Sequence, residues 1–193
     1  MKFTVRVGSP AASREPVLLG VTEGNSLPTW AAGWPSAWKK QIQSLLTSKK
    51  FSGKLNETFL LPVEGRWLIL VGAGKKEQLS LDRVRQAAAT ASRCVLQAGF
   101  DHFSRGLVAV PEATVEQAAQ AVTEGTILGT YRYIELKHVP AQERRSLKSV
   151  TLWVPRAADA AAAGKGIRRG QVIAEAVCWS RDLVNSPANR MTP

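Results

Sequence analysis

Few residues in this sequence of 193 could carry chemistry. A metal centre or a nucleophilic triad needs His, Cys, Asp or Glu side chains that converge on one point. The two histidines, His102 and His138, each lack a second candidate ligand at helix or hairpin spacing, and no Gly-x-Ser-x-Gly nucleophile motif occurs. The fifteen carboxylates are scattered along the chain. We therefore predict no catalytic residue and no metal ligand in this chain.

One glycine-rich turn, Gly72-Ala73-Gly74-Lys75, follows a continuous apolar run. Glycines between a buried strand and a helix can present backbone N–H groups to a phosphate. The turn matches neither the P-loop spacing nor the dinucleotide fingerprint, which needs a third glycine. We favour a plain strand-to-helix turn with solvated lysines. A phosphate-binding turn formed by Gly72, Gly74 and Lys75 is the alternative.

Tryptophans and lysines are concentrated in one N-terminal segment. Trp30, Trp34 and Trp38 recur every four residues, and residues 24–56 contain no acid. Aromatic rings beside cations could stack on bases and hold phosphates, which makes the segment a candidate nucleic-acid contact. Alternatively, the tryptophans fix a loop on the core and the lysines form a solvated helix face; Pro35 interrupts the spacing, so the rings need not form one stripe. The candidate lysines are Lys39, Lys40, Lys49, Lys50 and Lys54.

Composition and charge set the broad class. The chain is 45% hydrophobic and 21% charged, which is typical of a globular domain. No apolar run approaches the roughly 18 to 20 residues that span a bilayer, and the N-terminus has no signal-peptide core, so we predict a cytoplasmic protein without a membrane partner. Cys94 and Cys178 lack metal spacing, as is typical of a reducing compartment. The net charge of +11 either attracts a polyanion such as DNA or belongs to part of a larger protein.

Hydrophobic periodicity predicts strands that alternate with helices, and hence an α/β domain. We expect a three-layer α/β/α architecture with a mixed, largely parallel sheet and two helices on each side. Ser36, Ser80 and Thr114 are predicted N-caps, with Gln117 completing a capping box after Thr114. The predicted strands cover residues 2–7, 16–21, 55–61, 67–71, 106–110 and 149–154; the predicted helices begin near residues 36, 80, 115 and 158.

The C-terminal region is predicted to connect two domains. We expect residues 1–157 to form one domain and residues 158–193 to form a linker helix and the start of a connection. Glycines at 164–170 could interrupt that helix, and Ile173, Val177 and Leu183 are its candidate buried residues. Pro187 marks its end, and residues 191–193 are expected to be extended.

This C-terminal segment, SRDLVNSPANRMTP, resembles the segment that joins the two domains of leucyl aminopeptidases, the M17 metallopeptidases. The family pattern R-D-L-x-N-x-P-x-N-x-x-T-P precedes the catalytic domain. Three upstream segments, residues 51–54, 70–75 and 124–132, resemble the family's F-x-G-K, strand–G-x-G-K and E-G-x-x-L-x-x-Y-R motifs in the same order. The residues that match the C-terminal pattern are Arg181, Asp182, Leu183, Asn185, Pro187, Asn189, Thr192 and Pro193.

The resemblance implies a non-catalytic N-terminal domain, similar to macro domains, without its catalytic domain. The family's enzymes remove N-terminal residues from peptides with two divalent metal ions, zinc or manganese, held in motifs such as N-T-D-A-E-G-R. That motif is absent from this sequence, so we expect no cofactor here and carry over no metal ligand. The family forms cytosolic hexamers with these domains at the outer corners. The implied partners are therefore the chain's own catalytic domain and identical subunits.

Two other functions stay open at this point. A nucleic-acid-binding module would use the lysines from Lys39 to Lys54, and its affinity would fall steeply with salt. A macro-like nucleotide binder, for a ligand such as ADP-ribose, would use the turn from Gly72 to Lys75. That function needs a concave pocket with free backbone N–H groups at the carboxyl ends of the strands.

Overall fold

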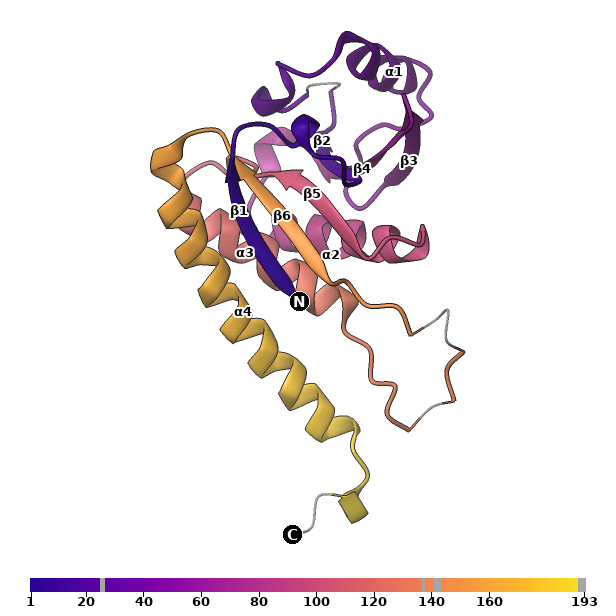
Figure 1. Cartoon of the computed structure of the whole chain (residues 1–193), viewed down its shortest axis with the longest axis vertical. Helices are drawn as coiled ribbons and strands as arrows, with labels where there is room; N and C mark the ends of the chain where they lie inside the picture. The colour runs from indigo at the N-terminus through magenta and orange to yellow at the C-terminus, as the bar shows by residue number, and fades with distance from the viewer. Residues whose placement is uncertain (25–26, 137, 141–143, 191–193) are drawn as a thin grey trace.

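The computed structural model describes residues 1–24, 27–136, 138–140 and 144–190, and it contains one six-stranded sheet in the order β1-β6-β5-β2-β4-β3 (Figure 1). All neighbouring strands are parallel except β3 and β4, which are antiparallel. The predicted α/β class with a mixed, largely parallel sheet is confirmed. Met191, Thr192 and Pro193, which were predicted to be extended, lie outside the described residues. The strands are β1 (Lys2–Val7), β2 (Val17–Thr22), β3 (Thr58–Val63), β4 (Arg66–Gly74), β5 (His102–Gly106) and β6 (Ser149–Val154); the α-helices are α1 (Ser36–Thr47), α2 (Leu81–Gln97), α3 (Val115–Thr130) and α4 (Ala157–Asn185).

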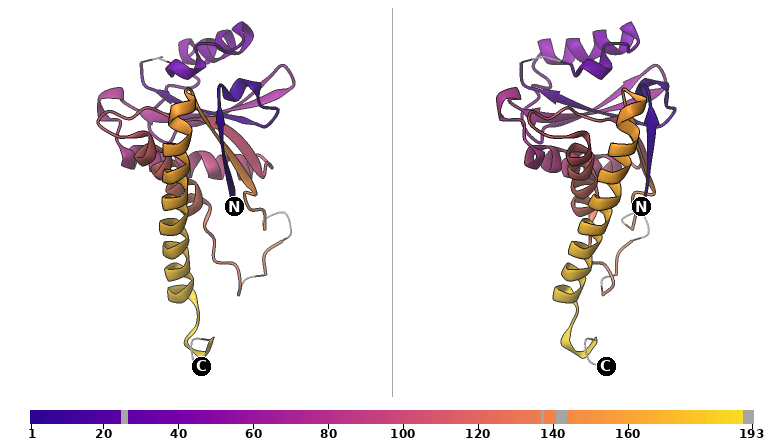
Figure 2. Two further views of the ribbon diagram at one scale, coloured as in Figure 1. Left: turned by 60° about the vertical axis from the view of Figure 1, so that its left-hand side comes forward. Right: turned by 90° about the vertical axis from the view of Figure 1, so that its left-hand side faces the viewer.

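The helices form the outer two of three layers. Helix α1 packs Trp38 and Ile42 against β2, β3 and β4 on one face, whereas α2, α3 and α4 share the other face (Figure 2). The prediction of two helices on each face of the sheet is therefore wrong. The connections β4-α2-β5 and β5-α3-β6 run across the sheet in the same direction, and right-handed crossovers in one direction place their helices on one face. The connection from β2 to β4 runs the opposite way and carries α1 to the other face.

Strand β5 lies earlier in the chain than the predicted strand at residues 106–110. It spans His102–Gly106, and residues 107–110 leave the sheet after the Leu107 amide donates to the Trp153 carbonyl at 2.9 Å. The hydropathy pattern hid this strand because two of its residues are polar and buried: Ser104 is 0% exposed and Arg105 is 4% exposed. Buried polar side chains give no hydrophobic signal.

The predicted helix caps are largely confirmed. The Ser80 side chain accepts from the Arg83 amide, and Thr114 and Gln117 form the predicted capping box at the start of α3. At α1 the cap position is Pro35, and Ser36 is the first helical residue, so that prediction is wrong by one position. Proline suits the start of a helix because the N–H it lacks would have no partner there.

Helix α4 is continuous over 29 residues, so the predicted interruption at residues 164–170 is wrong. The glycines serve packing instead. A Cβ on Gly166 would overlap the Glu116 carbonyl oxygen of α3, and one on Gly170 would lie 2.8 Å from the Gln120 carbonyl oxygen. Small residues let the two helix backbones approach closely.

The predicted burial of Ile173 and Leu183 on α4 is also wrong, because these side chains are 39% and 36% exposed.

We expect Gly166→Ala to destabilise the chain by about 1–3 kcal/mol, because the added methyl group must push α4 away from α3. Gly164→Ala is the matched control on the same helix, where the added Cβ meets only the Arg168 side chain at 3.6 Å. The control should be neutral or stabilising by up to about 1 kcal/mol, since alanine is the better helix former. Urea unfolding of both variants measures the difference, and equal stabilities would contradict this packing.

Candidate functional site

The glycine-rich turn is closed by a loop of its own chain. The Gly72 amide donates to the Glu57 carbonyl at 2.7 Å, and the Gly74 amide donates to the Gly53 carbonyl at 3.0 Å. A Cβ on Gly72 would overlap the Lys54 carbonyl oxygen, so glycine is required by the close approach of two backbones. The two amide groups on which the phosphate-binding hypothesis depends therefore already have partners. Lys75 is exposed, as expected for a solvated turn.

The loop against this turn is organised by one carboxylate. Glu57 Oε2 accepts hydrogen bonds from the Ser52 amide (3.0 Å), the Ser52 hydroxyl (2.8 Å) and the Lys54 amide (3.1 Å). Burial alone raises the pKa of Glu57, but these hydrogen bonds outweigh it and hold the pKa below its ordinary value of 4.5. The segments Phe51–Lys54 and Leu70–Lys75, two of those that carry the family resemblance, thus form one structural junction.

Replacing Glu57 by glutamine should show the junction's dependence on this charge. A carboxylate with a lowered folded-state pKa contributes stability above its unfolded value, and this contribution is lost as the pH falls through the folded value. We therefore expect Glu57→Gln to be destabilising at neutral pH and progressively less so below about pH 4.5. Urea unfolding of both proteins at neutral pH and at about pH 3 measures this. A stability difference that does not change with pH would contradict the role assigned to Glu57.

The three tryptophans of the candidate nucleic-acid segment form a continuous row inside the protein. The ring centroids of Trp30 and Trp34 lie 5.4 Å apart and those of Trp34 and Trp38 lie 5.3 Å apart, in edge contacts. Trp34 and Trp38 are each 2% exposed, and their indole N–H groups donate to Ser9 and Glu64. The rings do form one stripe, but the stripe fixes the segment to the core. The buried rings of Trp34 and Trp38 cannot stack on bases.

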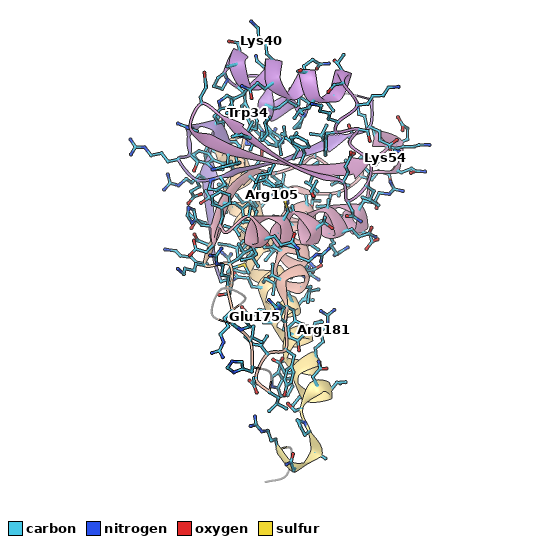
Figure 3. All side chains as sticks on the ribbon, turned by 90° about the vertical axis from the view of Figure 1, so that its right-hand side faces the viewer. Trp34, Lys40, Lys54, Arg105, Glu175 and Arg181 are labelled. Carbon is cyan, nitrogen blue, oxygen red and sulfur yellow. The ribbon has the colours of Figure 1, made fainter. Side chains whose placement is uncertain are left out.

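The candidate lysines remain at the surface. Lys40, Lys49, Lys50 and Lys54 are exposed, and Lys39 donates from Nζ to the Ala32 carbonyl at 3.0 Å. Figure 3 shows Lys40 on the outer side of α1 and Lys54 at another side of the domain. They form a dispersed positive surface. In the tryptophan row, Trp34 and Trp38 are buried and Trp30 is half-buried.

The histidines and carboxylates do not converge. Asp101 binds His102 Nδ1 at 2.7 Å and Lys148 Nζ at 2.5 Å at the amino end of β5, and hydrogen bonds from Lys148 and then His102 lower the pKa of Asp101 to about 2. His138 is exposed in the connection between α3 and β6. Over the described part of the chain, no group of three or more His, Cys, Asp or Glu side chains could hold a metal ion.

A cavity of about 230 Å³ lies where parallel sheets usually bind ligands, outside the carboxyl ends of β5 and β6. Its walls are mainly apolar, and the bidentate ion pair of Arg156 and Asp159 lies at its edge, with N–O distances of 2.8 and 2.9 Å. Gly72, Gly74 and Lys75 do not line it. The lining residues are Leu107, Val108, Ala109, Val110, Ala113, Thr114, Val115, Ala118, Pro155, Arg156 and Asp159.

The C-terminal motif contacts the end of α3. Tyr131 donates from its hydroxyl to Asp182 at 2.7 Å, and the Arg181 guanidinium lies 5.5 Å from the centre of the Tyr131 ring. Tyr133 and Ser186 add a hydroxyl contact at 3.2 Å. Two sequence segments that carry the family resemblance, one on α3 and one on α4, therefore bind each other and fix the direction of α4.

Sequence reasoning missed two features. The outer face of the C-terminal half of α4 is apolar and exposed: Val172 and Trp179, which lie seven residues apart, are 69% and 65% exposed. Their helical spacing was visible in the sequence. Arg105 lies between the sheet and α2 (Figure 3), where burial lowers its pKa to about 10 and its Nε has no hydrogen-bond partner within the described chain. No spacing rule signals such a buried arginine.

The structure is a three-layer α/β domain. The sequence segments that carry the family resemblance contact one another within this domain. Residues 18–140 match the family described as "Cytosol aminopeptidase family, N-terminal domain". The chain belongs to this family, as its N-terminal domain.

Individual relatives agree with this assignment. A probable cytosol aminopeptidase of Roseiflexus castenholzii is 34% identical over 200 residues, which include 100% of this chain and 38% of that relative. The chain thus spans well under half of that relative's length. A tomato leucine aminopeptidase mutant has a similar fold (TM-score 0.75, 18% identity, covering 100% of this chain and 40% of that one). So does an Oceanobacillus iheyensis macrodomain mutant (TM-score 0.62, 10% identity, 89% and 92% covered).

Proposed function

We propose that this chain is the non-catalytic assembly domain of a metal-dependent leucyl aminopeptidase that removes N-terminal residues from peptides. The proposal depends on the fixed direction and the exposed surface of helix α4. Bonds from Tyr131 to Asp182 and from Tyr133 to Ser186 hold its C-terminal half in a fixed direction, while its outer face is apolar and exposed. A fixed helix with an open apolar face positions a neighbour.

The chemistry is assigned to the rest of the enzyme. The described residues offer no group that fits the two divalent ions, zinc or manganese, of the M17 metallopeptidases. The proposed parent enzyme is cytoplasmic and hexameric, and this domain contributes to the shape of the hexamer. None of the helices within the described ranges has the length and apolar character needed to cross a membrane.

Nucleic-acid binding is the second candidate, and the comparisons with known proteins do not support it. Its remaining basis is the net charge of +11 and the exposed lysines Lys40, Lys49, Lys50 and Lys54. A nucleic-acid contact through these lysines would have an affinity that falls as the salt concentration rises. Nucleotide binding at Gly72 to Lys75 has still less support, because the amides of Gly72 and Gly74 are occupied.

Deleting residues 1–157 from the longer polypeptide tests what the domain adds. We expect the remainder to lose its hexameric mass in light scattering, with a fall in leucyl amide hydrolysis that follows the loss of assembly. An unchanged mass would contradict the assembly role. A salt titration of the intact 193-residue chain with duplex DNA tests the second candidate, and tight binding at physiological salt would favour it over the scaffold.

A further inference from the structure

Helix α4 changes character along its outer side. In its first half, Lys165, Arg168 and Arg169 are exposed there. From Val172 onward the same side carries Val172, Ala176, Trp179 and Leu183, all exposed. Figure 2 shows that this second half runs past the end of the sheet. The apolar face therefore begins where the helix leaves the body of the domain.

The four side chains form one stripe. Their successive spacings of four, three and four residues are those of a helix seam, and the stripe is about 17 Å long at 1.5 Å per residue. The opposite side of α4 packs Gly170 and Ala174 against the domain. A helix that is apolar on two sides is normally buried between two partners. The structure supplies one of them, helix α3.

A second copy of this chain fits the stripe poorly. In a parallel pairing of two α4 helices, Lys165 of one copy would face Lys165 of the other. In an antiparallel pairing centred on the stripe, Lys165 and Arg168 of each copy would lie beyond Asn185, where the other helix ends. Either arrangement brings together two chains that each carry a net charge of +11. The basic group formed by Lys165, Arg168 and Arg169 instead favours a partner with an acidic rim beside an apolar groove.

We propose that the remaining domain of the same aminopeptidase packs across this stripe as a fixed interface, with its own apolar groove over Val172 and Trp179 and its acidic groups toward Arg168. This inference rests on the proposed function. The length of the Roseiflexus relative, of which this chain spans 38%, leaves room for such a domain. The bonds of Tyr131 to Asp182 keep the stripe in one orientation before the partner docks. The helix is then a rigid part of the interface, unlike a flexible tether.

Cysteine accessibility tests the interface directly. In a background with Cys94→Ser, Cys178→Ser and any further cysteine of the longer polypeptide replaced by serine, Val172→Cys and Leu183→Cys place single thiols on the stripe. Gln43→Cys on the exposed side of α1 is the control. Each variant is made in the 193-residue chain and in the polypeptide continued by its natural C-terminal sequence. We expect maleimide labelling of the stripe thiols to be at least about tenfold slower in the longer polypeptide, and labelling of the control to be equal in both.

Two results would overturn the proposal. Equal labelling of the stripe thiols in both polypeptides would show that nothing covers the stripe. Protection in the 193-residue chain that increases with its concentration would identify a second copy as the occupant. Leucyl amide hydrolysis by the longer polypeptide is measured in parallel. Because activity depends on the proposed function and labelling on the interface, the two can fail separately.

Discussion

Gly72→Ala is expected to prevent this chain from forming its native sheet. The new methyl group would overlap the Lys54 carbonyl oxygen, and neither backbone can retreat, since the Gly72 amide is bonded to Glu57 and the Gly74 amide to Gly53. We expect a loss of at least about 3 kcal/mol, the upper end of the range for overpacking. Yield of soluble protein and the urea midpoint measure the effect.

Gly20→Ala is the matched control for this experiment. Gly20 also lies in a central strand, but a Cβ there meets only the Val108 side chain at an ordinary 3.8 Å. We expect the control to fold with a stability within about 1 kcal/mol of the original chain. If Gly72→Ala folds as well as Gly20→Ala, the junction between the loop and β4 has been assigned wrongly.

Trp38→Ala is expected to cost about 3–5 kcal/mol, the usual cost of truncating a buried aromatic side chain. The side chain is 2% exposed, contacts Trp34 edge to face, and donates to Glu64 at 3.1 Å. In a domain of this size the change should lower the melting temperature by roughly 6–20 °C. Calorimetry or circular dichroism against temperature measures it.

Trp179→Ala removes the same side chain from an exposed position and is the control for Trp38. Trp179 is 65% exposed, so its loss from the isolated chain should change stability by no more than about 0.5 kcal/mol. Trp38→Phe keeps most of the packing and loses the bond to Glu64, and should therefore lie between the two. If Trp38→Ala melts at the temperature of the Trp179 variant, the tryptophan row is not part of the core.

Local signals in the sequence predicted those parts of the fold that depend on local physics. Ser80 and Thr114 cap their helices as expected, because a hydroxyl three residues before a free amide binds it whatever surrounds the helix. The apolar run before Gly72 became strand β4, which lies between β2 and the edge strand β3. The tryptophans fix a loop on the core, as one of the two sequence interpretations predicted, and Pro35 does not separate their rings.

The errors arose where tertiary contacts outweigh local preference. Glycines in α4 were expected to interrupt the helix, yet Gly166 and Gly170 allow α3 to approach, which no local rule reveals. Strand β5 was displaced in the prediction because Ser104 and Arg105 are buried although polar. The apolar stripe on α4 was missed, because Ile173, Val177 and Leu183 were expected to pack on their own domain. Spacing shows that a helix has an apolar face and not which partner covers it.

Peptide hydrolysis distinguishes a non-catalytic domain from an active enzyme. The 193-residue chain and its natural continuation are each assayed with a leucyl amide substrate and added manganese. We expect turnover by the longer polypeptide and none by this chain, because its described residues bring together no set of metal ligands. Turnover by the purified 193-residue chain would contradict the assignment of a non-catalytic domain.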